Sequence, residues 1–151
     1  MTVRISVETE IPATPPVVWA AIEDIATHVE WMADAVRITF VTQQRRGVGT
    51  AFDCDTVVGP LRTTDRMTVT EWEPGSRMGI EHRGAVNGRG EFTLEPSPRG
   101  TRFRWTEQLQ FPWWLGSRLG EQIGKPVLTW IWRRNLTRLR AYVVAAREPR
   151  P

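Results

Sequence analysis

The sequence predicts an α+β fold in which a curved, seven-stranded antiparallel sheet wraps around a long C-terminal helix. Three observations support this prediction: short segments with alternating polar and apolar residues, turn-forming residues between them, and a terminal stretch with helical apolar spacing. A helix of that length can bury its apolar side only against a large concave surface, so we expect the sheet to hold it. A cavity is expected between sheet and helix.

The seven strands are expected where polar and apolar residues alternate, at residues 3–11, 36–43, 48–58, 61–72, 76–83, 86–95 and 101–111. The breaks between them are rich in the residues that favour turns, and include Arg46-Gly47, Gly59-Pro60, Pro74-Gly75, Gly84 and Pro98-Arg99-Gly100.

Two short helices are expected between the first and second strands. Pro15 and Pro16 lie where a helix begins, and the first helix contains Val17, Val18, Ala21 and Ile22. The second is expected to run from Thr27 to Trp31. His28 is expected to be solvated on this second helix.

The long helix is expected within residues 117–147, where apolar side chains recur at three- and four-residue steps. The inward face comprises Leu128, Trp132, Leu136 or Asn135, Leu139, Val143 and Ala146. The arginines at 133, 134, 138, 140 and 147 fall mostly on the other side. Pro126 predicts a kink or a helix start, with residues 117–125 as a separate turn, because proline removes a helical hydrogen bond.

Length and composition favour one domain over residues 1–148, followed by a frayed tail at 149–151, since 151 residues with 40% hydrophobic content suit a single core. Cys54 is the only cysteine, which excludes an internal disulfide framework, and we interpret it as a small core residue. His28 and His82 lack zinc-type spacing, so neither a metal nor a cofactor is expected. The oligomeric state stays open.

The charge pattern argues against nucleic-acid binding. The net charge is only +3, and the arginines are scattered along the chain, which is typical of solvated strand and helix faces. No apolar run approaches the roughly 20 residues needed to span a bilayer. We therefore expect a soluble, cytoplasmic protein without integral membrane association.

Strand parity indicates which side chains face the expected cavity, because neighbouring side chains on a strand point to opposite faces. In three strands an ionisable residue shares the apolar face: Asp65 with Thr63, Met67 and Val69, His82 with Met78 and Ile80, and Glu107 with Phe103, Trp105 and Leu109. These three ionisable residues are the candidate catalytic groups.

The hairpin that turns at Pro74-Gly75 is expected to place Asp65 opposite or diagonal to His82, close enough for a hydrogen bond, within one register step or a bulge beside Trp72. A carboxylate favours the charged imidazole and burial disfavours it, which is how a general acid or base is adjusted. There are alternatives to catalysis. Asp65, His82 and Glu107 are polar residues near an open rim, or they form a network that orients a ligand. In a further alternative, Glu107 contacts an arginine at the rim.

Eight tryptophans reinforce the prediction of a ligand-binding cavity. Trp19 and Trp31 are expected to pack in the core, and Trp113 and Trp114 to pack before the long helix or to form a lid or partner contact. The residues expected to bind ligand are Phe52, Thr63, Met67, Met78, Ile80, Phe92, Phe103, Trp105, Leu128 and Trp132.

Four segments carry a resemblance to a known family: IPATPPVVWAAIEDIATHVEW, GVGTAF, VTEWEPGSR and GRGEFTLEPSPRGTRFRWTEQ. With the order of the predicted elements, they resemble the START-like (SRPBCC) superfamily, close to its polyketide cyclase/dehydrase and lipid-transport branch. The resemblance covers nearly the whole chain and implies the helix-grip fold. Its members differ in task, since some bind lipids or plant hormones, some cyclise aromatic polyketides and some act as co-chaperones.

Three functions follow as hypotheses. The first is binding of an apolar, polycyclic or lipidic small molecule that is oriented by the ionisable groups in the cavity. The second is a polyketide cyclase or dehydratase, in which Glu107 or the Asp65/His82 pair moves a proton. The third is a protein interaction module that uses the arginine-bearing outer surfaces.

Overall fold

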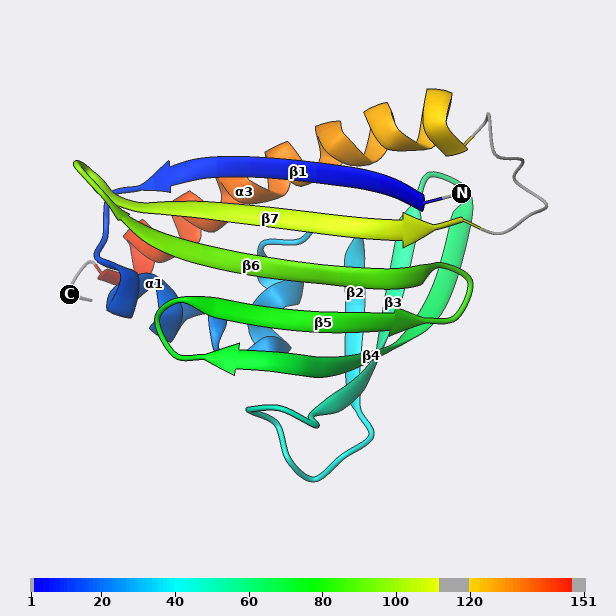
Figure 1. Cartoon of the computed structure of the whole chain (residues 1–151), viewed down its shortest axis with the longest axis horizontal. Coiled ribbons are helices and arrows are strands. Elements are labelled where there is room, and N and C mark those ends of the chain that lie inside the picture. Colours follow the sequence, from blue (N-terminus) through cyan, green and yellow to red (C-terminus); the bar gives the residue numbers. More distant parts are fainter. Residues whose placement is uncertain (1, 112–119, 148–151) are drawn as a thin grey trace.

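The computed structural model describes residues 2–111 and 120–147 and confirms the predicted α+β architecture. Within this part of the chain, seven strands form one antiparallel sheet in the order β1-β7-β6-β5-β4-β3-β2 (Figure 1). The strands are β1 (Thr2–Ile11), β2 (Ala35–Phe40), β3 (Ala51–Val58), β4 (Leu61–Glu73), β5 (Arg77–Arg83), β6 (Asn87–Ser97) and β7 (Gly100–Gln110). The helical elements are α1 (Pro15–Ile22), the 3₁₀ helix η1 (Ile25–Glu30), the π-helical turn η3 (Gly120–Gly124) and α3 (Lys125–Arg147).

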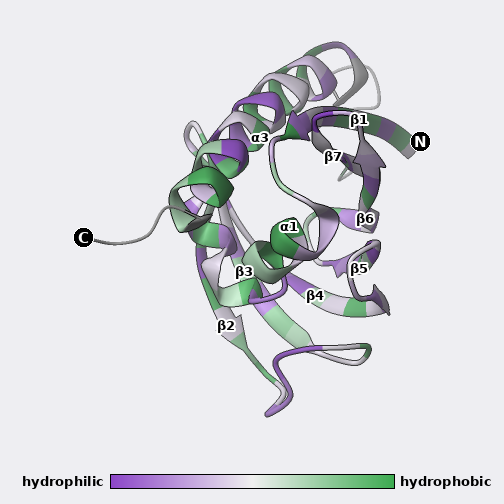
Figure 2. Cartoon of the chain, turned by 90° about the vertical axis from the view of Figure 1, so that its left-hand side faces the viewer, coloured by the Kyte–Doolittle hydropathy of each residue, from purple (hydrophilic) through white to green (hydrophobic). Residues whose placement is uncertain are grey.

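The sheet is open, with β1 and β2 at its two edges. It curves strongly, and α3 lies across its concave side, as Figure 2 shows in a view along the molecule. The helix packs against β1, while α1 and η1 lie at one end of the curved sheet. This is the helix-grip arrangement expected from the sequence.

Two of the expected strands are shorter than the sequence suggested. Residues 36–43 and 48–58 were expected to be extended, but β2 ends at Phe40 and β3 begins at Ala51. The intervening residues form a loop in which Gly47 and Gly49 have φ of 84° and 95°, a backbone conformation that glycine adopts without steric cost.

Pro126 marks a helix start and not a kink, because α3 begins at Lys125 and the missing N–H falls in the first turn. The preceding residues 120–124 form a separate π-helical turn, and residues 117–119 lie outside the described part of the chain. The predicted inward face is confirmed for Trp132, Asn135, Leu136, Leu139 and Val143. Ala146 is exposed near the end of the helix, which corrects its expected burial.

His28 is buried, with only 3% exposure, so the expectation that it is solvated was wrong. The tight 3₁₀ geometry of η1 turns its ring onto Trp31 and Phe92, and its Nε2–H donates to the Ile22 carbonyl at 2.7 Å. Burial lowers the pKa of His28 to about 4, although this hydrogen bond and the charge of Asp24 act in the opposite direction. The ring is therefore neutral and structural near pH 7.

A half-buried polar cluster joins α3 to the chain just before the edge strand β2. The Asn135 side chain is fully buried, accepts from the Ala33 N–H at 3.0 Å and donates to Asp34 Oδ1 at 2.6 Å. Trp132 Nε1 donates to the other oxygen of Asp34 at 3.2 Å. We call these contacts the Asn135 clamp. Because α3 also packs on β1, it is fixed at both edges of the sheet.

The described helices include none that combines the length and the apolar character needed to cross a membrane.

Candidate functional site

A cavity of about 440 Å³ lies between the concave face of the sheet and α3. This volume is in the range of pockets that enclose drug-sized ligands. Its wall is predominantly apolar and aromatic, as expected for a ligand that is driven from water by the hydrophobic effect. Of the residues predicted to bind ligand, those placed in this wall are Phe52, Thr63, Met67, Ile80, Phe92, Trp105, Leu128 and Trp132.

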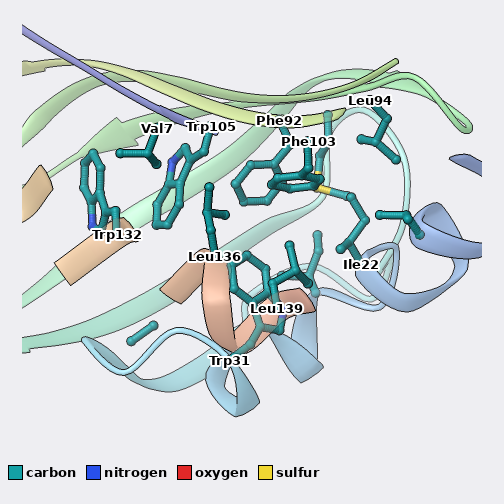
Figure 3. Packing of buried hydrophobic residues seen from close by; sticks show 14 of the residues in the cluster. Val7, Ile22, Trp31, Phe92, Leu94, Phe103, Trp105, Trp132, Leu136 and Leu139 are labelled. Carbon is teal, nitrogen blue, oxygen red and sulfur yellow. The ribbon is translucent and has the colours of Figure 1, made fainter. Parts of the chain in front are cut away.

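Met78 and Phe103 do not line the cavity, which corrects the prediction for these two residues. Both are completely buried, with 0% exposure. In Figure 3, Phe103 lies on the Leu94 and Ile22 side of Phe92, away from Trp105 and Trp132. Strand parity correctly predicted that both side chains face the concave side of the sheet. Parity does not show which part of that side is packed with side chains and which part lines the cavity.

Other wall residues were missed by the sequence reasoning. Asp34 lies between η1 and β2, where no strand alternation exists to assign it a face. His28 was assigned to the surface, yet it lines the cavity from η1. The three-residue spacing between His28 and Trp31, which places both on one side of a 3₁₀ turn, was the available signal.

The three candidate catalytic residues lie on three different strands and all line the cavity. A β-bulge in β4 between Val69 and Glu71 makes this possible, because it shifts the register by one residue. Beyond the bulge His82 pairs with Met67, so both face inward. Without this shift His82 would pair with Thr68, and the inward faces of β4 and β5 would not coincide.

The carboxylate partner of His82 is Glu107, which reaches it across β6. Nε2 of His82 lies 3.0 Å from Oε2 of Glu107, within ion-pair distance, although neither atom has hydrogen-bond geometry with a described residue. The second oxygen of Glu107 accepts from Trp105 Nε1 at 2.9 Å. Within the described part of the chain Glu107 therefore pairs with His82 and Trp105 and not with an arginine, which was one of the alternatives.

Trp105 also joins this polar site to α3. Its indole stacks on that of Trp132 with ring centroids 4.5 Å apart and an interplanar angle of 19° (Figure 3). Each indole N–H thus reaches a carboxylate, Glu107 from Trp105 and Asp34 from Trp132. The orientation of both rings is fixed by stacking and by hydrogen bonds together.

Asp65 is diagonal to His82, which is one of the two expected positions, but it does not form the expected hydrogen bond to it. Because Arg66 pairs with Arg83, Asp65 lies beside Gly84, just beyond the end of β5. Its Oδ1 instead accepts from the Val86 N–H at 3.3 Å, and the Thr63 hydroxyl lies 3.5 Å from its Oδ2. Asp65 still acts on the imidazole through its charge.

Two glycines clear the space that these inward carboxylates occupy. A Cβ at residue 90 would overlap the carboxylate of Glu107, and a Cβ at residue 84 would overlap that of Asp65. Gly90 lies on β6, between β5 and β7, and pairs with Ile80 of β5 on one side and with Glu107 of β7 on the other. The glycine at this position is what allows Glu107 to cross β6 and reach His82.

The environment of His82 favours its charged form. Burial lowers the pKa of the imidazole, but the charge of Glu107, its close contact and the charge of Asp65 together raise the pKa above the usual 6.5. The stabilisation from this pair is therefore complete below the unfolded-state pKa and is lost as pH rises through the raised folded-state pKa.

Cys54 lines the cavity but is not an activated nucleophile, because burial raises the pKa of its thiol to about 11. Among the described residues no group of three or more potential metal-ligating side chains comes together. Trp113 and Trp114 lie outside the described residues.

The comparisons with known proteins agree with this architecture. A family model described as polyketide cyclase / dehydrase and lipid transport matches residues 2–144. No curated protein matches the chain. Among solved structures, TTHA0849 from Thermus thermophilus is similar with a TM-score of 0.85 and 18% identity, and the alignment covers 97% of this chain and 100% of that one.

Two further solved structures are aromatase/cyclases by name. The di-domain ARO/CYC StfQ from the steffimycin biosynthetic pathway has a TM-score of 0.79 and 14% identity, with 97% of this chain and 52% of that chain covered. The Zhui aromatase/cyclase from a Streptomyces species has a TM-score of 0.71 and 12% identity, with 97% and 93% covered. At these identities the similarity is one of fold.

The Glu107→Gln substitution tests the electrostatic coupling at the site. It removes the negative charge beside His82 and keeps the side-chain shape, so we expect the raised pKa of His82 to fall in the variant. An NMR pH titration of the two imidazoles measures both groups. His28, with a pKa of about 4, is the internal control that should not move. An unchanged His82 titration would contradict the coupling.

Proposed function

The chain belongs to the polyketide cyclase / dehydrase and lipid transport family, and from this premise we propose that it binds a hydrophobic small molecule inside the cavity. The family match also confirms the resemblance seen in the sequence. The ligand is of polyketide, aromatic or lipid type, and it lies between the sheet and α3. The observation that carries the proposal is the cavity of about 440 Å³ with its apolar wall and its few polar groups.

The arrangement of the wall supports binding over simple packing. Burying apolar ligand surface contributes about 25 cal/mol per Å² of area removed from water, so the largely apolar wall favours an apolar guest. The polar groups are few, and His82 on β5 and Glu107 on β7 lie on the two sides of the intervening strand β6, which carries Gly90. Such a distribution orients a ligand while the wall supplies the affinity.

A second candidate function is cyclisation or dehydration of a polyketide, and the His82–Glu107 pair favours it. In this reaction the Glu107 carboxylate accepts a proton from a carbon flanked by two carbonyls. The resulting enolate attacks another carbonyl of the same chain and forms a carbon–carbon bond. The His82 imidazolium donates a proton to the new alkoxide, and loss of water then gives the unsaturated ring. The cavity enforces the folded conformation of the substrate.

The binding proposal predicts a saturable interaction with the neutral apolar dye Nile red. Ile80→Trp introduces a large side chain into the cavity wall, so we expect it to weaken dye affinity at least about tenfold by filling space. Dye fluorescence titration measures this.

The matched control is Val36→Trp, at a β2 position that is 47% exposed and outside the cavity wall, and it should leave the affinity unchanged. The proposal fails if the dye shows no saturation, or if the two variants behave alike while both remain folded by circular dichroism.

The cyclase candidate predicts turnover of a poly-β-carbonyl substrate by the wild-type protein. Glu107→Gln and His82→Ala each remove one proton-transfer group and should lower the turnover rate by roughly 10²- to 10⁴-fold. Product formation is followed by chromatography, with Nile red affinity as the check that the cavity persists. Equal rates in wild type and both variants would exclude these residues as the acid and base.

A further inference from the structure

The charges that line the cavity are predominantly of one sign. Among the described residues, the lining contains the three carboxylates of Asp34, Asp65 and Glu107, and no lysine or arginine takes part. The basic residues of the described chain lie elsewhere on its surface, for instance Arg62, Arg66 and Arg104 on strand positions that face away from the cavity. A ligand in the cavity therefore lies in a negatively charged environment.

The two imidazoles of the lining do not reverse this sign. His28 is neutral near pH 7, because burial lowers its pKa to about 4. His82 does acquire positive charge, but its Nε2 lies 3.0 Å from Glu107, so that charge is balanced by the nearest carboxylate. The Asp65 carboxylate lies beside this pair and accepts a hydrogen bond from the Val86 N–H, but no described lysine or arginine forms an ion pair with it.

The polar end of the cavity is closed around the pair of His82 and Glu107. Oε2 of Glu107 and Nε2 of His82 are both buried and lie 3.0 Å apart, and the other oxygen of Glu107 accepts from Trp105 Nε1. Because both atoms of the pair are buried, the positive charge of His82 is directed at Glu107 and not at a ligand in the cavity.

We propose that the cavity selects neutral aromatic compounds and excludes ligands with a free carboxylate or another anionic group. This inference rests on the proposed binding function and narrows it. The rings of the ligand lie against the aromatic wall. An anion placed in the cavity would face Asp65 and Glu107 in a medium of low polarity, and the described lining holds no lysine or arginine to balance its charge.

A matched pair of probes tests the selection. 9-Anthracenemethanol is neutral at pH 7 and carries a hydroxyl, while 9-anthracenecarboxylate has the same rings and is an anion. We expect saturable binding of the alcohol and at least about tenfold weaker binding of the carboxylate, measured by isothermal titration calorimetry at pH 7. Equal or tighter binding of the carboxylate would overturn the inference and leave the binding function standing. Failure of both probes to bind would count against both.

An isosteric variant shows whether the cavity carboxylates cause the selection. Asp65→Asn removes one negative charge and retains an oxygen that accepts from the Val86 N–H. The ratio of the affinity for 9-anthracenemethanol to that for 9-anthracenecarboxylate should fall by at least about threefold, because one repulsive charge has been removed. The matched control is Asp53→Asn, which removes the same charge outside the cavity, where Asp53 pairs with Arg66 at 2.6 Å. Equal ratios in the wild type and in both variants would overturn the electrostatic origin.

Discussion

The structure depends on the way in which α3 is held across an open, curved sheet. The helix packs along β1 at one edge, and the Asn135 clamp joins it to Ala33 and Asp34, just before β2 at the other. Because both edges are fixed, the helix spans the concave face and does not collapse onto it. The space that remains is the cavity, so the binding site is a direct consequence of the fold.

The polar end of the cavity carries a cost that the surrounding residues offset. Removing carboxylates from water is unfavourable unless charges or donors compensate. Glu107 is compensated by His82 and by the Trp105 N–H, Asp65 by the Val86 N–H, and Asp34 by the clamp. The glycines at positions 84 and 90 supply the room for two of these groups. Carboxylates that are removed from water at one end of an apolar cavity are typical of a functional site.

The sequence predicted the strands, the terminal helix and the inward direction of Asp65, His82 and Glu107, because alternation and helical spacing are local properties. The partner of His82 could not be found in this way. It depends on a bulge in β4 and on a side chain that crosses β6 over Gly90, and both are set by the packing of several strands. His28 was misassigned because a short 3₁₀ helix offers only one three-residue step, from His28 to Trp31, and no longer periodic pattern. Met78 and Phe103 show that facing inward is not the same as lining a cavity.

The central claim is that α3 is fixed at both edges of the sheet, and the free energy of unfolding of Asn135→Ala tests it most directly. This substitution leaves the Ala33 N–H and an oxygen of Asp34 without their partner, so urea denaturation should show a loss of about 3 kcal/mol. Asn87→Ala, at an exposed turn where Asn87 accepts from the Gly84 N–H, is the control and should cost about 1 kcal/mol or less. Equal losses in the two variants would contradict the claim.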